Sequence, residues 1–74
     1  MRPLYVIATE IRDSWPKINY AAEPYLQAMG KLDSITDMYY EDSAQSIVRY
    51  FLSNASSFRG ENARRIKAEL KSML

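Results

Sequence analysis

The sequence of 74 residues contains neither cysteine nor histidine. Without them the chain has no disulfide, no thiol nucleophile, no imidazole base and none of the usual zinc or copper ligands. No calcium-loop, phosphate-loop, Gly-x-Ser-x-Gly or His-Glu-x-x-His motif occurs either. Only carboxylates, hydroxyls, lysine and arginine are left for catalysis. We therefore expect a protein that is not an enzyme and holds neither a metal nor a cofactor.

The chain also lacks a long apolar run and a charge of one dominant sign. The run Leu4–Ala8 is too short for the core of a signal peptide, and Glu10 soon follows it. No stretch approaches the roughly 20 apolar residues that a membrane span needs. Ten basic and nine acidic side chains leave a net charge of +1, which favours no particular class of partner. We expect a cytoplasmic protein with no membrane partner.

Five segments carry apolar residues at helical spacing, and none shows a sustained strand alternation. The expected helices cover about residues 4–15, 22–29, 34–39, 44–58 and 60–74. The loops between them are short, and no repeat or linker is visible. This pattern predicts an all-α fold, a compact bundle of four to five short helices that forms a single domain over residues 1–74.

Capping residues predict where these helices begin and end. Gly30 suits a left-handed cap after the second helix, and Gly60 breaks the chain before the last one. Ser34 followed by Asp37 resembles a capping box and predicts the start of the third helix. The fourth helix is expected to start after Asp42 or Ser43 and, because Phe58 stays in phase with its apolar face, to run to about Phe58.

The densest acidic run comprises Asp33, Asp37, Glu41 and Asp42, and no basic residue lies between Lys31 and Arg49. Helix capping is the favoured interpretation, because carboxylates stabilise the first turns of helices. A metal site, or a patch that imitates nucleic-acid phosphates, is the alternative.

Tyrosines are numerous, with six in the chain. A buried tyrosine ring fills a core and keeps its hydroxyl in water, and an exposed one offers a partner a large contact area. We expect Tyr25 and Tyr39 to fill the core. Tyr40 and Tyr50 flank the apolar stripes, so core packing and partner contact remain equally open for them.

Charge becomes asymmetric toward the C-terminus. Residues 59–74 hold five basic and two acidic side chains, a balance of +3, whereas residues 1–58 have a balance of −2. In the last helix Arg64, Lys67 and Lys71 fall on one narrow stripe beside the apolar face, and Arg59 precedes it. These four residues are candidate partner contacts for an acidic surface or for phosphates. A solvated helix face is the favoured interpretation, because the helix dipole favours basic residues near a helix C-terminus.

Arg65 differs from these four in its neighbours along the helix. Glu61 and Glu69 lie four residues before and after it, so we expect both to neutralise it. We also expect Arg64 and Lys67 to be replaceable at little cost to stability, because surface charges contribute little to folding.

The segments Tyr20–Met29, Ile47–Gly60 and Ala63–Lys71 resemble small uncharacterised proteins of bacteriophages and of conjugative or integrative elements of Gram-positive bacteria. The resemblance covers nearly the whole chain and implies a setting, the cytoplasm of a bacterial host cell. Small accessory proteins of mobile elements often bind and block a host protein, including restriction and CRISPR machinery. The resemblance carries no functional residue with it.

Three functions remain open at this point. The leading one is a non-enzymatic, helical protein-interaction module of a phage or mobile element that binds a host or element-encoded protein. Inhibition of a host defence system, of anti-CRISPR or anti-restriction type, is one form of it. The first alternative is a small nucleic-acid-binding protein that uses its basic C-terminal helix. The second is a structural or dimerising protein, a homodimer whose exposed tyrosines pack against a second copy.

Overall fold

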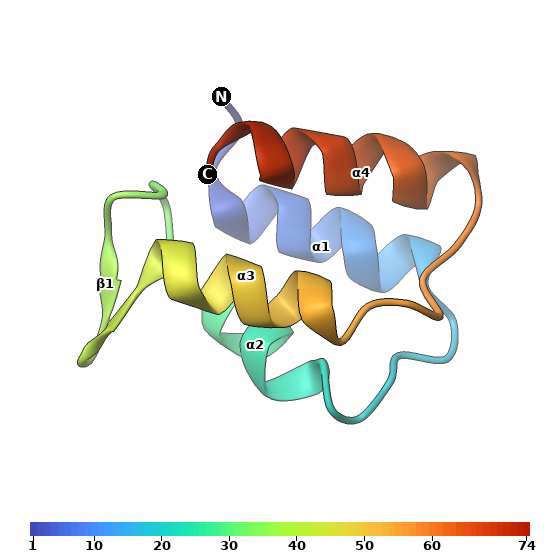
Figure 1. The fold of residues 1–74 in the computed structure, drawn as a ribbon, viewed down its shortest axis with the longest axis horizontal. Coiled ribbons are helices and arrows are strands. Elements are labelled where there is room, and N and C mark those ends of the chain that lie inside the picture. Colours follow the sequence, from blue (N-terminus) through green and yellow to red (C-terminus); the bar gives the residue numbers. More distant parts are fainter.

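The computed structural model describes residues 1–74 and shows a compact, mostly helical fold (Figure 1). Four α-helices and one short hairpin follow in the order α1 (Leu4–Ser14), α2 (Glu23–Met29), β1 (Met38–Tyr39), β2 (Asp42–Ser43), α3 (Ala44–Ser53) and α4 (Glu61–Ser72). Helix α1 packs against α2 and α4, and α2 packs against α3. The expected helical character is therefore confirmed. None of the helices has the length and apolar content needed to cross a membrane.

The core is entirely apolar, since all 20 buried residues are hydrophobic. An aromatic cluster lies at its centre. The Trp15 ring stacks on Phe58 with 5.1 Å between centroids and meets Phe51 edge-on at 6.2 Å. Trp15 thus joins the end of α1 to α3 and to the α3–α4 loop. Because every buried side chain is apolar, polar chemistry is confined to the surface.

Prolines mark the end of α1 and the start of α2, as expected, but Gly30 does not adopt the expected conformation. Helix α1 ends just before Pro16, and Pro24 lies in the first turn of α2, where its missing N–H is not needed. Gly30 has a right-handed φ of −63°, so the predicted left-handed cap is wrong. The chain continues in a tight turn, in which the Leu32 N–H donates to the Met29 carbonyl. This turn carries Leu32 into the core.

The predicted third helix is wrong. The Asp37 carboxylate accepts hydrogen bonds from the backbone N–H groups of Ser34, at 2.9 Å, and Asp33, at 3.1 Å. The capping residues therefore do act as caps, but of a single turn. The chain then extends into an antiparallel hairpin in which Tyr39 pairs with Asp42. Tyr40, at the turn, has a positive φ of 56°.

Helix α3 is shorter than its apolar phase predicts. The Ser43 side chain accepts a bond from the Ser46 N–H at 3.1 Å, which confirms Ser43 as the N-cap. The helix ends at Ser53, where the Asn54 side chain donates to the Tyr50 carbonyl at 2.8 Å. Phe58 is nevertheless buried, because a separate turn after the helix points it inward. Its predicted burial is confirmed and its predicted helical conformation is wrong.

Candidate functional site

Helix α4 has an apolar inner face and two different flanks. The inner face consists of Ala63, Ile66 and Leu70. The helix begins after Gly60, because the φ of 108° at this glycine is incompatible with a helical conformation. At 100° per residue, Arg65 and Glu69 lie on one flank, and Arg64, Lys67 and Lys71 lie on the other. The first flank meets α1, and the second is turned away from it.

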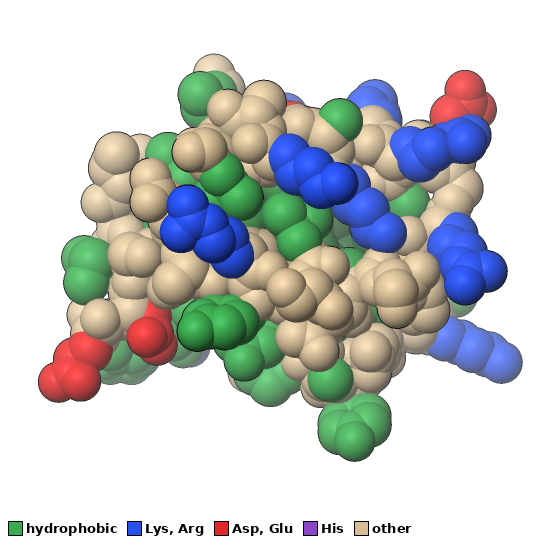
Figure 2. All heavy atoms as spheres, viewed as in Figure 1, with side chains coloured by type: hydrophobic (Ala, Val, Ile, Leu, Met, Phe, Trp, Pro, Cys, Tyr) green, Lys and Arg blue, Asp and Glu red, His purple; other side chains and the backbone are tan.

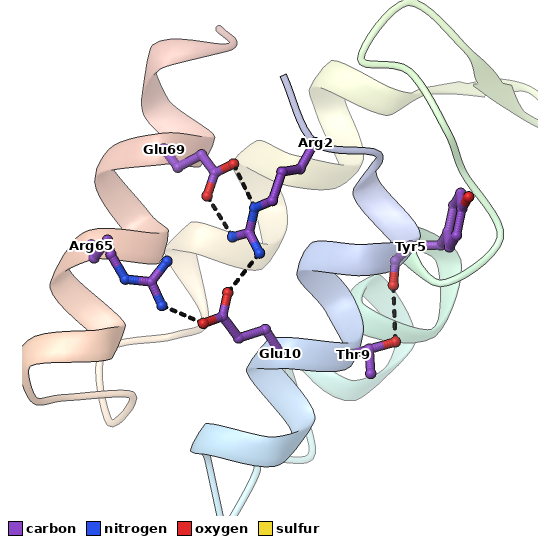
Figure 3. Close-up of polar contacts among 6 residues, drawn as sticks. All are labelled: Arg2, Tyr5, Thr9, Glu10, Arg65 and Glu69. Carbon is purple, nitrogen blue, oxygen red and sulfur yellow. Dashed lines mark hydrogen bonds and ion pairs between the residues drawn. The ribbon is translucent and has the colours of Figure 1, made fainter.

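The flank toward α1 is joined to it by a four-residue ion-pair network (Figure 3). The Arg2 guanidinium donates two hydrogen bonds to the Glu69 carboxylate, one of 3.0 Å from Nε and one of 2.6 Å from Nη2. Its remaining nitrogen, Nη1, lies 2.8 Å from Glu10 Oε1, and Arg65 pairs with the other oxygen of Glu10. The network therefore ties the N-terminus of the chain and α1 to the last helix.

The network changes the acid–base properties of its members. The hydrogen bond from Arg2 lowers the pKa of Glu69. The hydrogen bond from Arg65, followed by that from Arg2, lowers the pKa of Glu10. The same carboxylates raise the pKa of Arg2. Arg65 is neutralised as expected, but by Glu10 of α1; the predicted pairing with Glu61 and Glu69 within its own helix is wrong.

The opposite flank forms, with the preceding loop, a surface that we call the cationic face: Arg59, Arg64, Lys67 and Lys71. None of the four takes part in an ion pair, whereas Arg2, Arg12 and Arg65 all do. Figure 2 shows basic side chains gathered over α3 and α4, with acidic ones only at the margins of the view. The structure thus places these four predicted contact residues on one surface.

Lys67 is the exception within the cationic face, because it has a structural role. Its half-buried ammonium donates to the Phe58 carbonyl at 2.6 Å and lies 5.7 Å from the centre of the Phe58 ring. Burial lowers the pKa of Lys67, and the nearby charges of Lys71 and Arg59 lower it further. This contact was not expected for Lys67, which sequence reasoning treated as a free surface charge. Arg59, Arg64 and Lys71 are exposed and remain available to a partner, although Arg59 also donates from Nε to the Ser56 carbonyl at 3.3 Å.

Arg49 is an unpaired cation on α3 that sequence reasoning missed. It is exposed, it has no ion pair, and it is the only basic residue of α3. It lies about 100° around the helix from Tyr50, whose ring stacks on Tyr25 of α2.

The two candidate tyrosines lie on other surfaces. Tyr40 is 85% exposed at the hairpin turn, and its ring meets the Tyr39 ring edge-on with 4.8 Å between centroids. Tyr50 is 55% exposed and stacks on Tyr25 with 5.5 Å between ring centroids. Tyr25 and Tyr39 are half-buried against the core, which confirms their predicted packing role. The structure therefore does not combine Tyr40 or Tyr50 with the cationic face.

The acidic run is divided by the turn and hairpin. Asp37 caps the turn, and the other three carboxylates, of Asp33, Glu41 and Asp42, are exposed. No group of three or more acidic side chains comes close enough to hold a metal ion. Capping, the favoured interpretation, applies to Asp37 only, since Ser43 is the cap of α3.

A single pocket opens between the N-terminus and the turn at residues 33–35. Its volume of about 130 Å³ is below the roughly 300–1,000 Å³ of typical ligand sites. Arg2, the basic side chain in its wall, is already held by Glu69 and Glu10.

Comparison with protein-family models, with characterised proteins and with solved structures finds no match to this chain. The resemblance to proteins of mobile elements therefore stays a prediction. The candidate site is defined by its own geometry.

Proposed function

We propose that this protein is a non-enzymatic helical interaction module that binds an acidic surface of another protein through its cationic face. One observation carries the proposal. The chain pairs Arg2, Arg12 and Arg65 with carboxylates but leaves Arg59, Arg64 and Lys71 exposed and unpaired on one side. The setting implied by the resemblance is the cytoplasm of a bacterium that carries a phage or mobile element. The partner is then a host or element-encoded protein, such as a component of a restriction or CRISPR system.

The unpaired charges favour such a partner for a physical reason. Like charges held together repel one another: beyond the effect of burial, which is the main cause, the charges of Lys71 and Arg59 further lower the pKa of Lys67. An acidic surface relieves this repulsion and steers the encounter over distances of about 10 Å at moderate salt. Arginine adds directional recognition, because its guanidinium binds carboxylates with two parallel hydrogen bonds.

The proposal is tested by capture from a bacterial lysate with matched variants. We expect the wild-type protein to retain a protein partner that the double variant Arg64→Glu, Lys71→Glu loses. Lys31→Glu, compared with the single variant Arg64→Glu, makes the same change of charge at an exposed residue outside the cationic face and should retain the partner. Equal recovery with Lys31→Glu and Arg64→Glu would refute the cationic face as the binding surface.

Nucleic-acid binding is the second candidate, and the same unpaired cations favour it. Arginine and lysine bind phosphates as well as they bind carboxylates. If the protein binds duplex DNA, the affinity should fall steeply with salt, with a slope of log K against log salt of about −3 to −4 for four phosphate contacts. A titration with a fluorescent duplex at several salt concentrations measures this slope. The absence of salt-dependent binding would leave the protein partner as the function.

A further inference from the structure

The molecule has a second surface of unusual composition, the β1–β2 hairpin. Glu41 and Asp42 are exposed there and have no ion pair. Two large apolar side chains accompany them, Tyr40 at 85% exposure and Met38 at 58%. The hairpin therefore presents negative charge around an exposed aromatic ring. Such a ring contributes much of the binding energy when a partner covers it.

The hairpin and the start of the cationic face at Arg59 complement each other in charge and lie toward opposite ends of the long axis of the molecule. In Figure 1 the hairpin lies at one end of the long axis, and the α3–α4 loop, which carries Arg59, lies at the other. The α1–α2 loop also starts at that other end and carries the exposed Lys17. In Figure 2 acidic side chains are visible at the hairpin end, and most basic ones lie at the centre and at the opposite end.

The surface between the basic side chains is partly apolar. Figure 2 shows hydrophobic side chains exposed between the lysines and arginines over α3 and α4. Leu52 of α3 is only half-buried and packs against the edge of the core. An aromatic ring placed there would bury apolar surface, which is favourable at about 25 cal/mol per Å².

We propose that two copies of this chain associate through these surfaces, with the hairpin of each copy against the cationic end of the other. A twofold axis that lies in the interface, across the long axis, brings both complementary contacts together at once. Such a symmetric dimer is closed, so the acidic and basic ends of both copies are used and no filament grows. Glu41 and Asp42 meet Arg59 and Lys17 of the second copy, and Tyr40 supplies the apolar contact.

This proposal goes beyond the proposed function. Self-association covers part of the cationic face, so it competes with the binding of an acidic partner. The dimer is then a state in which the face is protected until a partner with a stronger negative charge displaces the second copy. The contacts are ionic at their rim, so the dimer is weakened by salt.

Sedimentation equilibrium of the purified protein alone tests the dimer, over a concentration series at about 0.05 M and about 0.5 M salt. We expect the apparent mass to rise toward twice the monomer mass at low salt and to fall toward the monomer mass at high salt. A protein that stays monomeric throughout the low-salt series would overturn the proposal. No partner is present, so this result is independent of the proposed function.

Charge-reversed variants identify the contact itself. Glu41→Lys with Asp42→Lys, and separately Arg59→Glu with Lys17→Glu, should each be monomeric, because like charges then face each other. An equimolar mixture of the two variants should form a heterodimer, since both of its contacts then have opposite charges, one as in the wild type and the other exchanged. Asp13→Lys, at an exposed carboxylate outside the hairpin, should still dimerise. Failure of the mixture to associate, or loss of the dimer in Asp13→Lys, would show that these surfaces do not meet.

Discussion

The two flanks of α4 have similar side chains and opposite roles. On one flank Arg65 and Glu69 join Glu10 and Arg2 in a network that fastens α4 to the start of the chain. On the other, Arg64 and Lys71 face solvent without a partner. Arg64 and Arg65 are adjacent in sequence and differ only in what lies opposite them. The tertiary environment of a charge, more than its residue type, decides whether it stabilises the fold or is free to bind.

Lys67 shows that the division is not complete. It lies on the free flank, but its ammonium is hydrogen-bonded to the Phe58 carbonyl. It thereby holds the loop that presents Arg59. One lysine of the cationic face thus supports the surface, and the remaining three residues of the face are exposed.

The largest expected loss of stability comes from a substitution in the core that both flanks share. Phe51 is fully buried and touches the edge of Trp15. Truncation of a buried phenylalanine costs about 3–5 kcal/mol, and a domain of this length has only about 4–7 kcal/mol in total. We expect Phe51→Ala to be largely unfolded at physiological temperature by circular dichroism. The neighbouring half-exposed Tyr50→Ala should keep a cooperative transition; the same transition in Phe51→Ala would contradict the assigned core.

The next largest loss of stability is expected when the ion pairs of the flank toward α1 are removed. Arg2→Gln removes the contacts to both Glu69 and Glu10 and should cost about 1–2 kcal/mol, the combined effect of two partly exposed pairs. Arg12→Gln removes the isolated, exposed pair with Glu23 and should cost less than about 0.5 kcal/mol. Urea denaturation of both variants measures the difference. Equal losses would mean that the network is no stronger than an ordinary surface pair.

The network also gives a pH dependence with a defined sign. The pKa values of Glu69 and Glu10 are lowered in the folded state, so their contribution to stability is present above the usual glutamate pKa of about 4.3. That contribution is lost as the pH falls through the folded-state pKa values. The difference in Tm between wild type and Arg2→Gln should therefore be constant near neutral pH and shrink below about pH 4. A difference that persists unchanged in acid would contradict the electrostatic origin.

A smaller effect concerns the supporting lysine. Lys67→Met keeps the apolar stem but loses the hydrogen bond to the Phe58 carbonyl, which should cost about 0.5–1 kcal/mol. Relief of the repulsion from Lys71 and Arg59 offsets part of this loss. Thermal denaturation measures it, and Lys71→Met, at an exposed position, serves as the control. A Lys67→Met variant as stable as the control would show that the ammonium does not hold the loop.

Apolar periodicity predicted the core better than it predicted the helices. Phe58 is buried as its phase indicated, although the helix ends at Ser53, because a turn can orient a side chain inward as a helix does. The segment from Ser34 has the caps of a helix but too few apolar contacts to extend one. Its capping bonds therefore close a turn, and a hairpin follows.

The positions of the charged residues along α4 were predictable from the sequence, but their partners on other elements were not. Helical spacing placed Arg64 and Lys71 on one side from the sequence alone. The partners of Arg65 and Lys67 come from residues 55 and 9 positions away, which no local pattern contains.

The most direct test of the difference between the flanks compares charge reversals at two neighbouring arginines. Arg65→Glu places a carboxylate beside Glu10 and Glu69 and should lower Tm by about 4–8 °C, the equivalent of roughly 1 kcal/mol in a domain of this size. Arg64→Glu makes the same chemical change on the free flank and should leave Tm within about 2 °C of the wild type, because unpaired surface charges contribute little. Differential scanning calorimetry of the two variants measures both values. Equal decreases in Tm would contradict the account that one flank holds the fold together and the other is free to bind.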